Sequence, residues 1–264
     1  MVPVLIDLGP VALHTFGAMM ALAFLIAGYV VSIEFGRKGM DPEDAWSVVL
    51  WAAVGGVVGA RIFVIFSDWQ GFLDQPLAFL LTGSGFIWYG GLIGGFLSVS
   101  AFILRRGLSW LAAVDCIAPA LALGQAIGRV GCQISGDGDW GTPTRLPWAM
   151  RYPDAVIGWE AWTRSQGLPA DVTVHPAPVY ETLAYCAIFL LLWRLRDRGL
   201  ADGSLLWLYL VMASVARFLV EIVRIEPVVA AGLTQAQWLA IVLALAGTAM
   251  LFRATREPRS CEAG

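Results

Sequence analysis

Long runs of apolar residues alternate with shorter polar segments along the whole chain. Seven of these runs come close to the roughly 20 residues that a helix needs to cross a membrane. The pattern predicts an all-α integral membrane protein with about seven transmembrane helices, folded as a single polytopic membrane domain over residues 1–264. The expected spans are 11–33, 45–66, 86–104, 111–132, 178–195, 204–223 and 236–252.

Composition supports the membrane assignment. Hydrophobic residues make up 58% of the chain and charged residues 14%, whereas soluble domains run at roughly 45–50% and about 25%. A soluble enzyme and a disordered protein are therefore poor fits. The net charge of −3 provides no basic excess for a phosphate backbone, so no nucleic acid partner is expected. The four cysteines form neither a CxxC pair nor a zinc-binding spacing with histidine.

The basic residues predict how the chain is oriented. Most of the 17 Lys and Arg residues follow the odd-numbered spans, as Arg37, Arg105, Arg194 and Arg253 do. Segments rich in Lys and Arg face the cytoplasm, so the N-terminus is expected outside and the C-terminus inside. The first 36 residues contain no Lys or Arg. A cleavable signal peptide begins with positive charge, so the first span is expected to be a retained helix.

The longest polar stretch, residues 134–177, separates the fourth and fifth spans. It is rich in Trp and Tyr, which favour the membrane–water interface. We expect an aromatic belt combined with a small cap on the outer side. A loop of this length often has a function as well, such as covering a site.

Small residues recur at four-residue spacing within several spans. Such faces allow helices to approach closely, and close packing is the expected role here. The pairs are Gly55 with Gly59, Gly90 with Gly94, Gly91 with Gly95, and Gly124 with Gly128.

Charged residues inside the spans carry the most information about function. In the sixth span, Arg217, Glu221 and Arg224 are spaced by four and three residues, which places them on one helix face with Glu221 able to pair with either arginine. Arg129 lies near the outer end of the fourth span. One interpretation is structural: ion pairs fix the register of the helices. Arg61 and Arg224 lie near the ends of spans, so their long side chains can also reach the membrane–water interface. The other interpretation is functional. A guanidinium group binds phosphate through two parallel hydrogen bonds, and charged side chains within a membrane are rare and usually functional. Two arginines facing an outer cavity indicate an anionic phospholipid headgroup.

Two further patterns are weak. Asp137-Gly-Asp139 resembles part of a calcium loop but lacks a third spaced ligand and a distal Glu, so no metal is expected. Gly83-Ser84-Gly85 resembles a serine-protease turn, but His175 precedes a span instead of lying within one. An intramembrane serine protease is therefore a poor fit.

Six motifs follow one another in order over nearly the whole sequence. They are Gly9-Pro-Val-Ala-Leu-His14, Gly59-Ala-Arg61, Gly90-Gly-Leu-Ile-Gly94, Gly128-Arg129-Val-Gly131 with Gly136-Asp137 and Trp140-Gly141, His175-Pro with Tyr180-Glu181, and Arg217-Phe-Leu-Val-Glu221 with Arg224. Together they resemble the prolipoprotein diacylglyceryl transferase family. This family moves a diacylglyceryl group from phosphatidylglycerol to the lipobox cysteine of a preprolipoprotein and releases glycerol phosphate.

The resemblance implies roles for individual residues. Arg129 and Arg217 would hold the phosphate and stabilise its growing charge. Glu221 would orient the arginines of its own helix, and Asp137 would position Arg129. Further lipid-binding residues implied are Arg61, Arg224, His14, Phe16, Gly141 and Cys132. The implied partners are phosphatidylglycerol, the lipobox segment and membrane lipid in the bacterial inner membrane, with no cofactor.

Several positions depart from the family pattern. The histidine expected before the Gly90 motif, the family's proposed base, is Tyr89 here. The asparagine expected three residues after Arg129 is Cys132, the tyrosine expected four residues before Arg217 is Ala213, and Gly138 is an apparent insertion. The family has an aromatic pair after the first histidine, and the corresponding residues here are Thr15 and Phe16, so one aromatic hydroxyl is missing. An ordinary tyrosine is a poor base at pH 7, so Tyr89 would need a nearby arginine to activate it. Otherwise His14 or bound water would take the proton.

Two alternative functions are open from the sequence. A relative without catalytic activity would bind anionic phospholipid or a lipidated partner through the same arginines. A transporter or channel would need a continuous polar path, and the inner halves of most spans are apolar.

Overall fold

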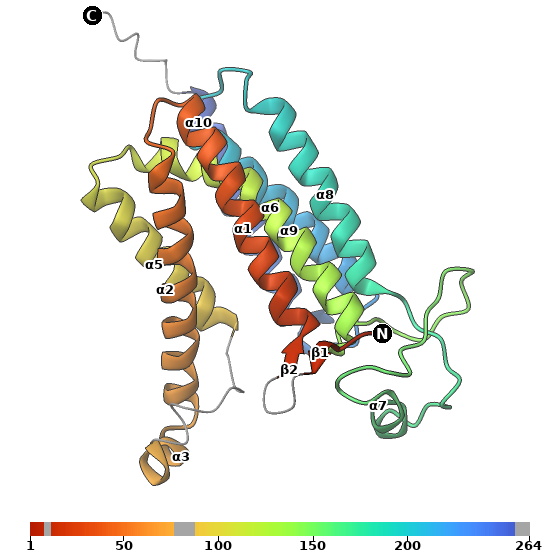
Figure 1. Cartoon of the computed structure of the whole chain (residues 1–264). Helices are drawn as coiled ribbons and strands as arrows, with labels where there is room; N and C mark the ends of the chain where they lie inside the picture. Colours follow the sequence, from red (N-terminus) through yellow and green to blue (C-terminus); the bar gives the residue numbers. More distant parts are fainter. Residues whose placement is uncertain (8–11, 77–87, 257–264) are drawn as a thin grey trace, which may run out of the picture. The chain divides into compact units, whose positions relative to one another are not determined.

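The computed structural model describes residues 1–7, 12–76 and 88–256, and seven long helices dominate it (Figure 1). Six of them are long and apolar enough to cross a membrane, and Tyr89–Arg105 is a shorter apolar helix. Each helix coincides with a span expected from the sequence, so the chain is a multi-pass, all-helical membrane protein. The helices are α1 Thr15–Arg37, α2 Glu43–Ser67, α5 Trp88–Arg105, α6 Trp110–Ser135, α8 Ala177–Leu195, α9 Ser204–Glu221 and α10 Gln235–Arg256.

Short elements connect these helices. The short helices are α3 Trp69–Asp74 and α7 Trp159–Ser165. Two antiparallel hairpins pair β1 Val4–Asp7 with β2 Ala12–His14, and β3 Val228–Ala230 with β4 Leu233–Thr234.

The first hairpin corrects the expected start of the first span. Residues 12–14 form a strand, and α1 begins only at Thr15. The backbone N–H of Thr15 donates to the carbonyl of Pro3 at 3.0 Å, and its hydroxyl donates to the carbonyl of Val2. The incoming strand thus satisfies a donor at the helix N-terminus that hydropathy alone cannot reveal.

Contacts divide the chain into two compact units. One comprises Met1–Ala27 with Asp115–Gly264, and the other Gly28–Val114. The second unit is built on α2 and α5, whose glycine faces meet. A Cβ on Gly94 would lie 2.8 Å from the Cα of Gly59, and Ser98 Oγ donates to the Trp51 carbonyl at 2.7 Å. The predicted close packing of these two helices is confirmed.

The first unit packs α6, α8 and α9 around small side chains. Ala118, Ala122 and Ala126 of α6 are buried against Tyr185 of α8 and Tyr209 of α9. The predicted close packing at Gly124 is wrong, because a Cβ there would meet no described atom within 4 Å.

Asp115, a charge within the fourth span, caps another helix. Its carboxylate accepts the backbone N–H groups of Gly203 at 2.8 Å and Leu206 at 2.9 Å. These groups lie at the N-terminus of α9, where helical N–H donors lack partners and a negative charge is favoured. Asp115 therefore ties α6 to α9.

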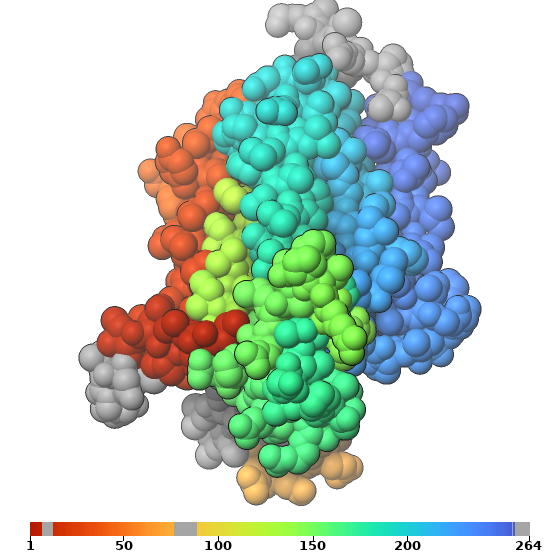
Figure 2. Space-filling model, turned by 90° about the vertical axis from the view of Figure 1, so that its right-hand side faces the viewer, coloured from red at the N-terminus to blue at the C-terminus, as the bar shows by residue number. Residues whose placement is uncertain are grey.

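Residues 136–176 between α6 and α8 form the cap, seen at the N-terminal end of α8 in Figure 2. Its centre is aromatic: Trp140, Tyr152 and Trp159 are buried, and the rings of Trp140 and Tyr152 stack at 4.8 Å. Burial raises the pKa of Tyr152 to about 12. The expected aromatic belt is thus wrong for these three residues, which form a small core, whereas Trp148 is exposed.

Candidate functional site

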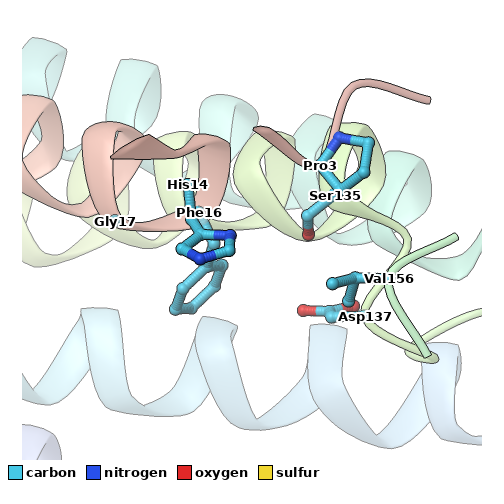
Figure 3. Close-up of a pocket in the computed structure, with 7 residues that line it drawn as sticks. All are labelled: Pro3, His14, Phe16, Gly17, Ser135, Asp137 and Val156. Carbon is cyan, nitrogen blue, oxygen red and sulfur yellow. The ribbon is translucent and has the colours of Figure 1, made fainter. Parts of the chain in front are cut away.

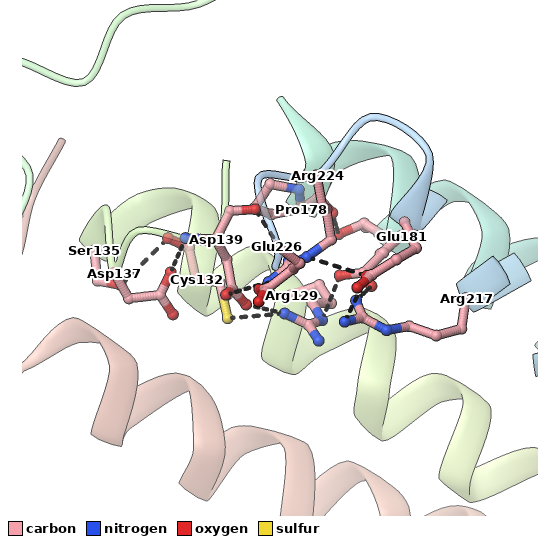
Figure 4. A network of polar contacts seen from close by, with 12 residues as sticks. Arg129, Cys132, Ser135, Asp137, Asp139, Pro178, Glu181, Arg217, Arg224 and Glu226 are labelled. Atoms are coloured by element: carbon pink, nitrogen blue, oxygen red, sulfur yellow. Dashed lines mark hydrogen bonds and ion pairs between the residues drawn. The ribbon is translucent and has the colours of Figure 1, made fainter. Parts of the chain in front are cut away.

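A buried carboxylate joins the arginines of two helices. Glu181 of α8 lies 2.7 Å from Arg129 Nε of α6 through Oε2, and 2.7 Å from Arg217 Nη1 of α9 through Oε1 (Figure 4). The Glu181 side chain is 2% exposed. An isolated charge at such a position is unfavourable, and it is tolerated here because two cations share it.

Arg217 and Glu221 of α9 pair across one helical turn, as their spacing predicted. The predicted placement of Arg224 on the same helix is wrong, because α9 ends at Glu221 and Arg224 follows it in a bridge with Gly141. Glu221 Oε2 lies 2.8 Å from Arg217 Nη2 and 3.4 Å from Arg224 Nε. Its other oxygen accepts the Thr234 hydroxyl of β4 at 2.9 Å. Glu221 therefore connects both arginines to the hairpin that follows α9.

The loop after α6 contributes a third carboxylate. Asp139 pairs with Arg129, and its Oδ1 accepts from Arg224 Nη2 at 2.9 Å. Arg224 also contacts Glu226 at 3.0 Å. Asp139 thus bridges the guanidinium group of Arg129 in α6 and that of Arg224, which lies just after α9.

The position of Asp139 corrects one sequence expectation. Asp137 was expected to position Arg129, but the carboxylate that pairs with Arg129 is Asp139. Asp137 instead hydrogen-bonds the Cys132 thiol and accepts the backbone N–H of Asp139 at 3.3 Å. Two positive-φ glycines, Gly136 and Gly138, shape this turn, in which Asp139 pairs with the arginines.

The two aspartates are in opposite electrostatic situations. Burial raises the pKa of Asp137 above its usual value, and its Cys132 hydrogen bond only partly opposes this. Burial would also raise the pKa of Asp139, but the charges of Arg224 and Arg129 outweigh it and lower the pKa. Asp139 therefore stays ionised, whereas Asp137 favours protonation more than a solvent-exposed aspartate does.

Gly141 lies where three backbone segments meet. Its N–H donates to the carbonyl of His175 at 2.8 Å, and it forms an isolated bridge with Arg224. A Cβ at this position would lie 2.8 Å from the Cβ of His175. The close approach requires glycine, and it fixes the backbone of Arg224 beside the cap.

A cavity of about 300 Å³ lies next to the network in the same unit. It brings together His14, Phe16 and Asp137, three residues that the sequence assigned to the site (Figure 3). The other lining residues are Pro3, Gly17, Ser135 and Val156.

The remaining predicted residues have separate surroundings. Cys132 is buried in the last turn of α6, with Arg129 Nη1 at 3.8 Å from its sulfur. Arg61 of α2 and Tyr89 of the first turn of α5 are half-buried and belong to the second unit. The serine-protease turn at Ser84 lies outside the described residues.

Oxygen and sulfur atoms of Cys132, Asp137 and Asp139 lie within 4.8 Å of one another, a spacing that can hold a metal ion. Two guanidinium groups already engage Asp139, and their positive charge disfavours a cation. This geometry therefore does not favour calcium binding at Asp137 and Asp139.

Sequence reasoning assigned no role to three carboxylates of the network, Glu181, Asp139 and Glu226. Glu181 is the one acidic residue within the 178–195 span. The rule that singled out Glu221, that ionisable residues inside spans are functional candidates, applies to it equally. Asp139 had no comparable signal, because neighbouring aspartates in a loop look alike in sequence.

The fold and network define a class: a multi-pass membrane protein with a cluster of arginines and carboxylates buried among apolar helices. The family model for prolipoprotein diacylglyceryl transferase matches residues 3–253. The chain belongs to this family.

Curated relatives share its length as well as its sequence. The chain is 34% identical to the phosphatidylglycerol–prolipoprotein diacylglyceryl transferase of Bordetella bronchiseptica, over 97% of this chain and 96% of that protein. It is 31% identical to the protein of the same name from Gloeobacter violaceus, over 99% and 96%. The corresponding protein of Clostridium tetani is 29% identical, over 86% and 87%.

Proposed function

We propose that this protein transfers a diacylglyceryl group from phosphatidylglycerol to the lipobox cysteine thiol of a preprolipoprotein. The observation that carries this is the convergence of Arg129, Arg217 and Arg224 on shared carboxylates between apolar helices, in a chain whose relatives are named for that reaction. The protein would work in the bacterial inner membrane with its N-terminus outside, because the basic residues favour that orientation.

The reaction exchanges one bond for another. The thiolate sulfur attacks the glycerol carbon of the diacylglyceryl group, the bond from that carbon to the phosphate oxygen breaks, and glycerol phosphate leaves with the electron pair. Charge therefore grows on the phosphate oxygen in the transition state. Guanidinium groups placed there stabilise that charge in a site with little water. Arg129 and Arg217, each about a quarter exposed, are suited to this role.

The carboxylates position these arginines. Glu181 holds Arg129 and Arg217 at the spacing of its own two oxygens, and Glu221 restrains Arg217 from the other side. A guanidinium fixed in this way loses less side-chain entropy when the phosphate binds.

The attacking thiol must lose its proton, because the thiolate is the nucleophile. His14 and Asp137 line the cavity beside the network, and Tyr89 takes the place of the family's proposed base. We assign the proton transfer to His14 or a water molecule in this cavity, with Phe16 supplying an apolar wall for the lipid, or to Tyr89, which the family resemblance implies and which belongs to the other unit.

An assay with purified protein tests the proposal. Phosphatidylglycerol in detergent and a peptide with one lipobox cysteine are the substrates, and peptide mass and released glycerol phosphate are measured. We expect a diacylglyceryl mass gain in the wild type, none in Arg129→Ala, and an unchanged gain in Arg253→Ala, which removes an exposed arginine at the end of α10. A wild type that binds phosphatidylglycerol without transfer would contradict the proposal and favour the non-catalytic lipid-binding alternative.

A further inference from the structure

The arginine network already holds anions, and they differ in how firmly they are fixed. Glu181 and Glu221 are 2% and 1% exposed, lie on helices, and each contacts two arginines. Asp139 is 30% exposed and lies on a loop. Glu226 is 39% exposed but contacts only Arg224 among the described arginines, whereas Asp139 bridges Arg129 and Arg224. Exchange of an anion between two arginines would therefore take place most easily at Asp139.

The contacts of Asp139 have the geometry of a bound phosphodiester. Oδ2 pairs with Arg129 and Oδ1 with Arg224, so two oxygens on one central atom each meet a different guanidinium. The two non-bridging oxygens of a phosphodiester can make the same pair of contacts. Arg217 lies outside this bridge, because its Nη1 and Nη2 face Glu181 and Glu221 at 2.7 and 2.8 Å.

Charge balance agrees with exchange at this position. The three arginines carry three positive charges, and the two buried glutamates carry two negative charges. Glu226 adds a third negative charge beside Arg224, so a phosphodiester monoanion would replace the single negative charge of Asp139 one for one and leave the net charge of the cluster unchanged.

The loop that carries Asp139 contains two glycines. Gly136 and Gly138 have φ values of 66° and 96°, and glycine tolerates the backbone changes that a moving loop requires. The same loop lines the 300 Å³ cavity through Asp137. Besides its ion pairs, Asp139 has two hydrogen bonds among the described residues. Its carbonyl accepts from Arg224 Nη1 at 3.2 Å, and its N–H donates to Asp137 Oδ1 at 3.3 Å.

We propose that Asp139 is an internal counter-ion that occupies the phosphate position between Arg129 and Arg224, and that a lipid phosphodiester monoanion displaces it on binding. This inference rests on the proposed function and adds a positioning residue to it. It adds Arg224 to Arg129 and Arg217 as a residue that contacts the phosphate, and it makes Asp139 a residue that lowers the affinity for lipid until it is displaced.

Binding of short-chain phosphatidylglycerol to purified protein tests the proposal. Asp139→Asn keeps the side-chain shape and removes the competing charge, so we expect its Kd to fall at least threefold, with a matching fall in KM. Asp139→Glu keeps the charge and should not bind more tightly than the wild type. Asp154→Asn makes the same charge change at an exposed position of the cap, and its Kd should not change.

Inorganic phosphate and glycerol phosphate distinguish a lipid site from a general phosphate site. If the lipid phosphodiester is the ligand, Asp139→Asn tightens phosphatidylglycerol binding more than it tightens binding of either soluble anion. An equal gain for inorganic phosphate would overturn the assignment to a phosphodiester.

A second measurement uses the wild type, so it does not depend on how the variant folds. Displacement of Asp139 predicts faster amide hydrogen exchange over residues 136–139 when short-chain phosphatidylglycerol is bound. Slower or unchanged exchange there, or weaker lipid binding by Asp139→Asn, would show that Asp139 stays in place. Failure of the proposed function is a separate result, namely the absence of diacylglyceryl transfer by the wild type.

Discussion

Replacement of Glu181 by glutamine probes the centre of the network. The carboxylate offers one oxygen to Arg129 and the other to Arg217. Glutamine has nearly the same shape but only one acceptor, and its NH₂ group would face the second guanidinium. Glu181→Gln therefore leaves one arginine opposite a donor and removes the negative charge that both arginines share.

The expected size of the effect follows from burial. Removal of one partner from a buried ion pair costs about 3–5 kcal/mol of unfolding free energy. Arg129 and Arg217 keep Asp139 and Glu221 as partners and are about a quarter exposed, so we expect a loss of about 2–3 kcal/mol. Misplacement of the two guanidinium groups by about 1 Å is expected to lower kcat/KM by roughly 100-fold.

Unfolding in mixed micelles titrated with sodium dodecyl sulfate gives the free energy, and the transfer assay gives kcat/KM. Glu160→Gln is the matched control, because Glu160 is exposed in the first turn of α7; its stability should stay within about 0.5 kcal/mol of the wild type. A Glu181→Gln protein with wild-type stability and kcat/KM within threefold would refute the argument that this carboxylate positions the arginines.

Four further outcomes are expected. Because the pKa of Asp139 is lowered on folding, its stabilising contribution is fully present above its unfolded pKa of about 3.9 and is lost as pH falls below that value; a pH titration of stability that is steeper in the wild type than in Asp139→Asn checks this. Gly94→Ala should destabilise α2–α5 packing by about 1–3 kcal/mol, whereas Gly95→Ala, whose Cβ would lie 3.4 Å from its nearest neighbour, should change stability little; equal melting temperatures would contradict the packing argument. Asp115→Ala should cost about 2 kcal/mol through loss of the α9 cap, measured by the same unfolding titration, and an unchanged midpoint would exclude the capping role. Tyr89→Phe should lower the transfer rate about 100-fold if the hydroxyl moves the proton, while phosphatidylglycerol binding persists; an unchanged rate would leave the proton to His14 or water.

The spans and the charge pattern of α9 could be predicted because they are local properties. A run of apolar residues of membrane length forms a helix wherever it lies, since only internal hydrogen bonds satisfy its backbone in lipid. Likewise, the spacing of Arg217 and Glu221 places them on one helix face regardless of what surrounds the helix, whereas Arg224 lies beyond the end of α9. The family motifs added the identity of Arg129 as a partner in the same site.

The tertiary structure alone decided which carboxylates complete that site. Glu181 is 52 residues from Arg129 in sequence, and their contact depends on how α6 and α8 are rotated against each other. The choice of Asp139 over Asp137 depends on two positive-φ glycines and on the bridge between Gly141 and Arg224. The sequence by itself determined that charges are buried in a membrane bundle. Their pairing was settled by helix packing and loop conformation, because the energy of an ion pair depends on distances that no sequence period encodes.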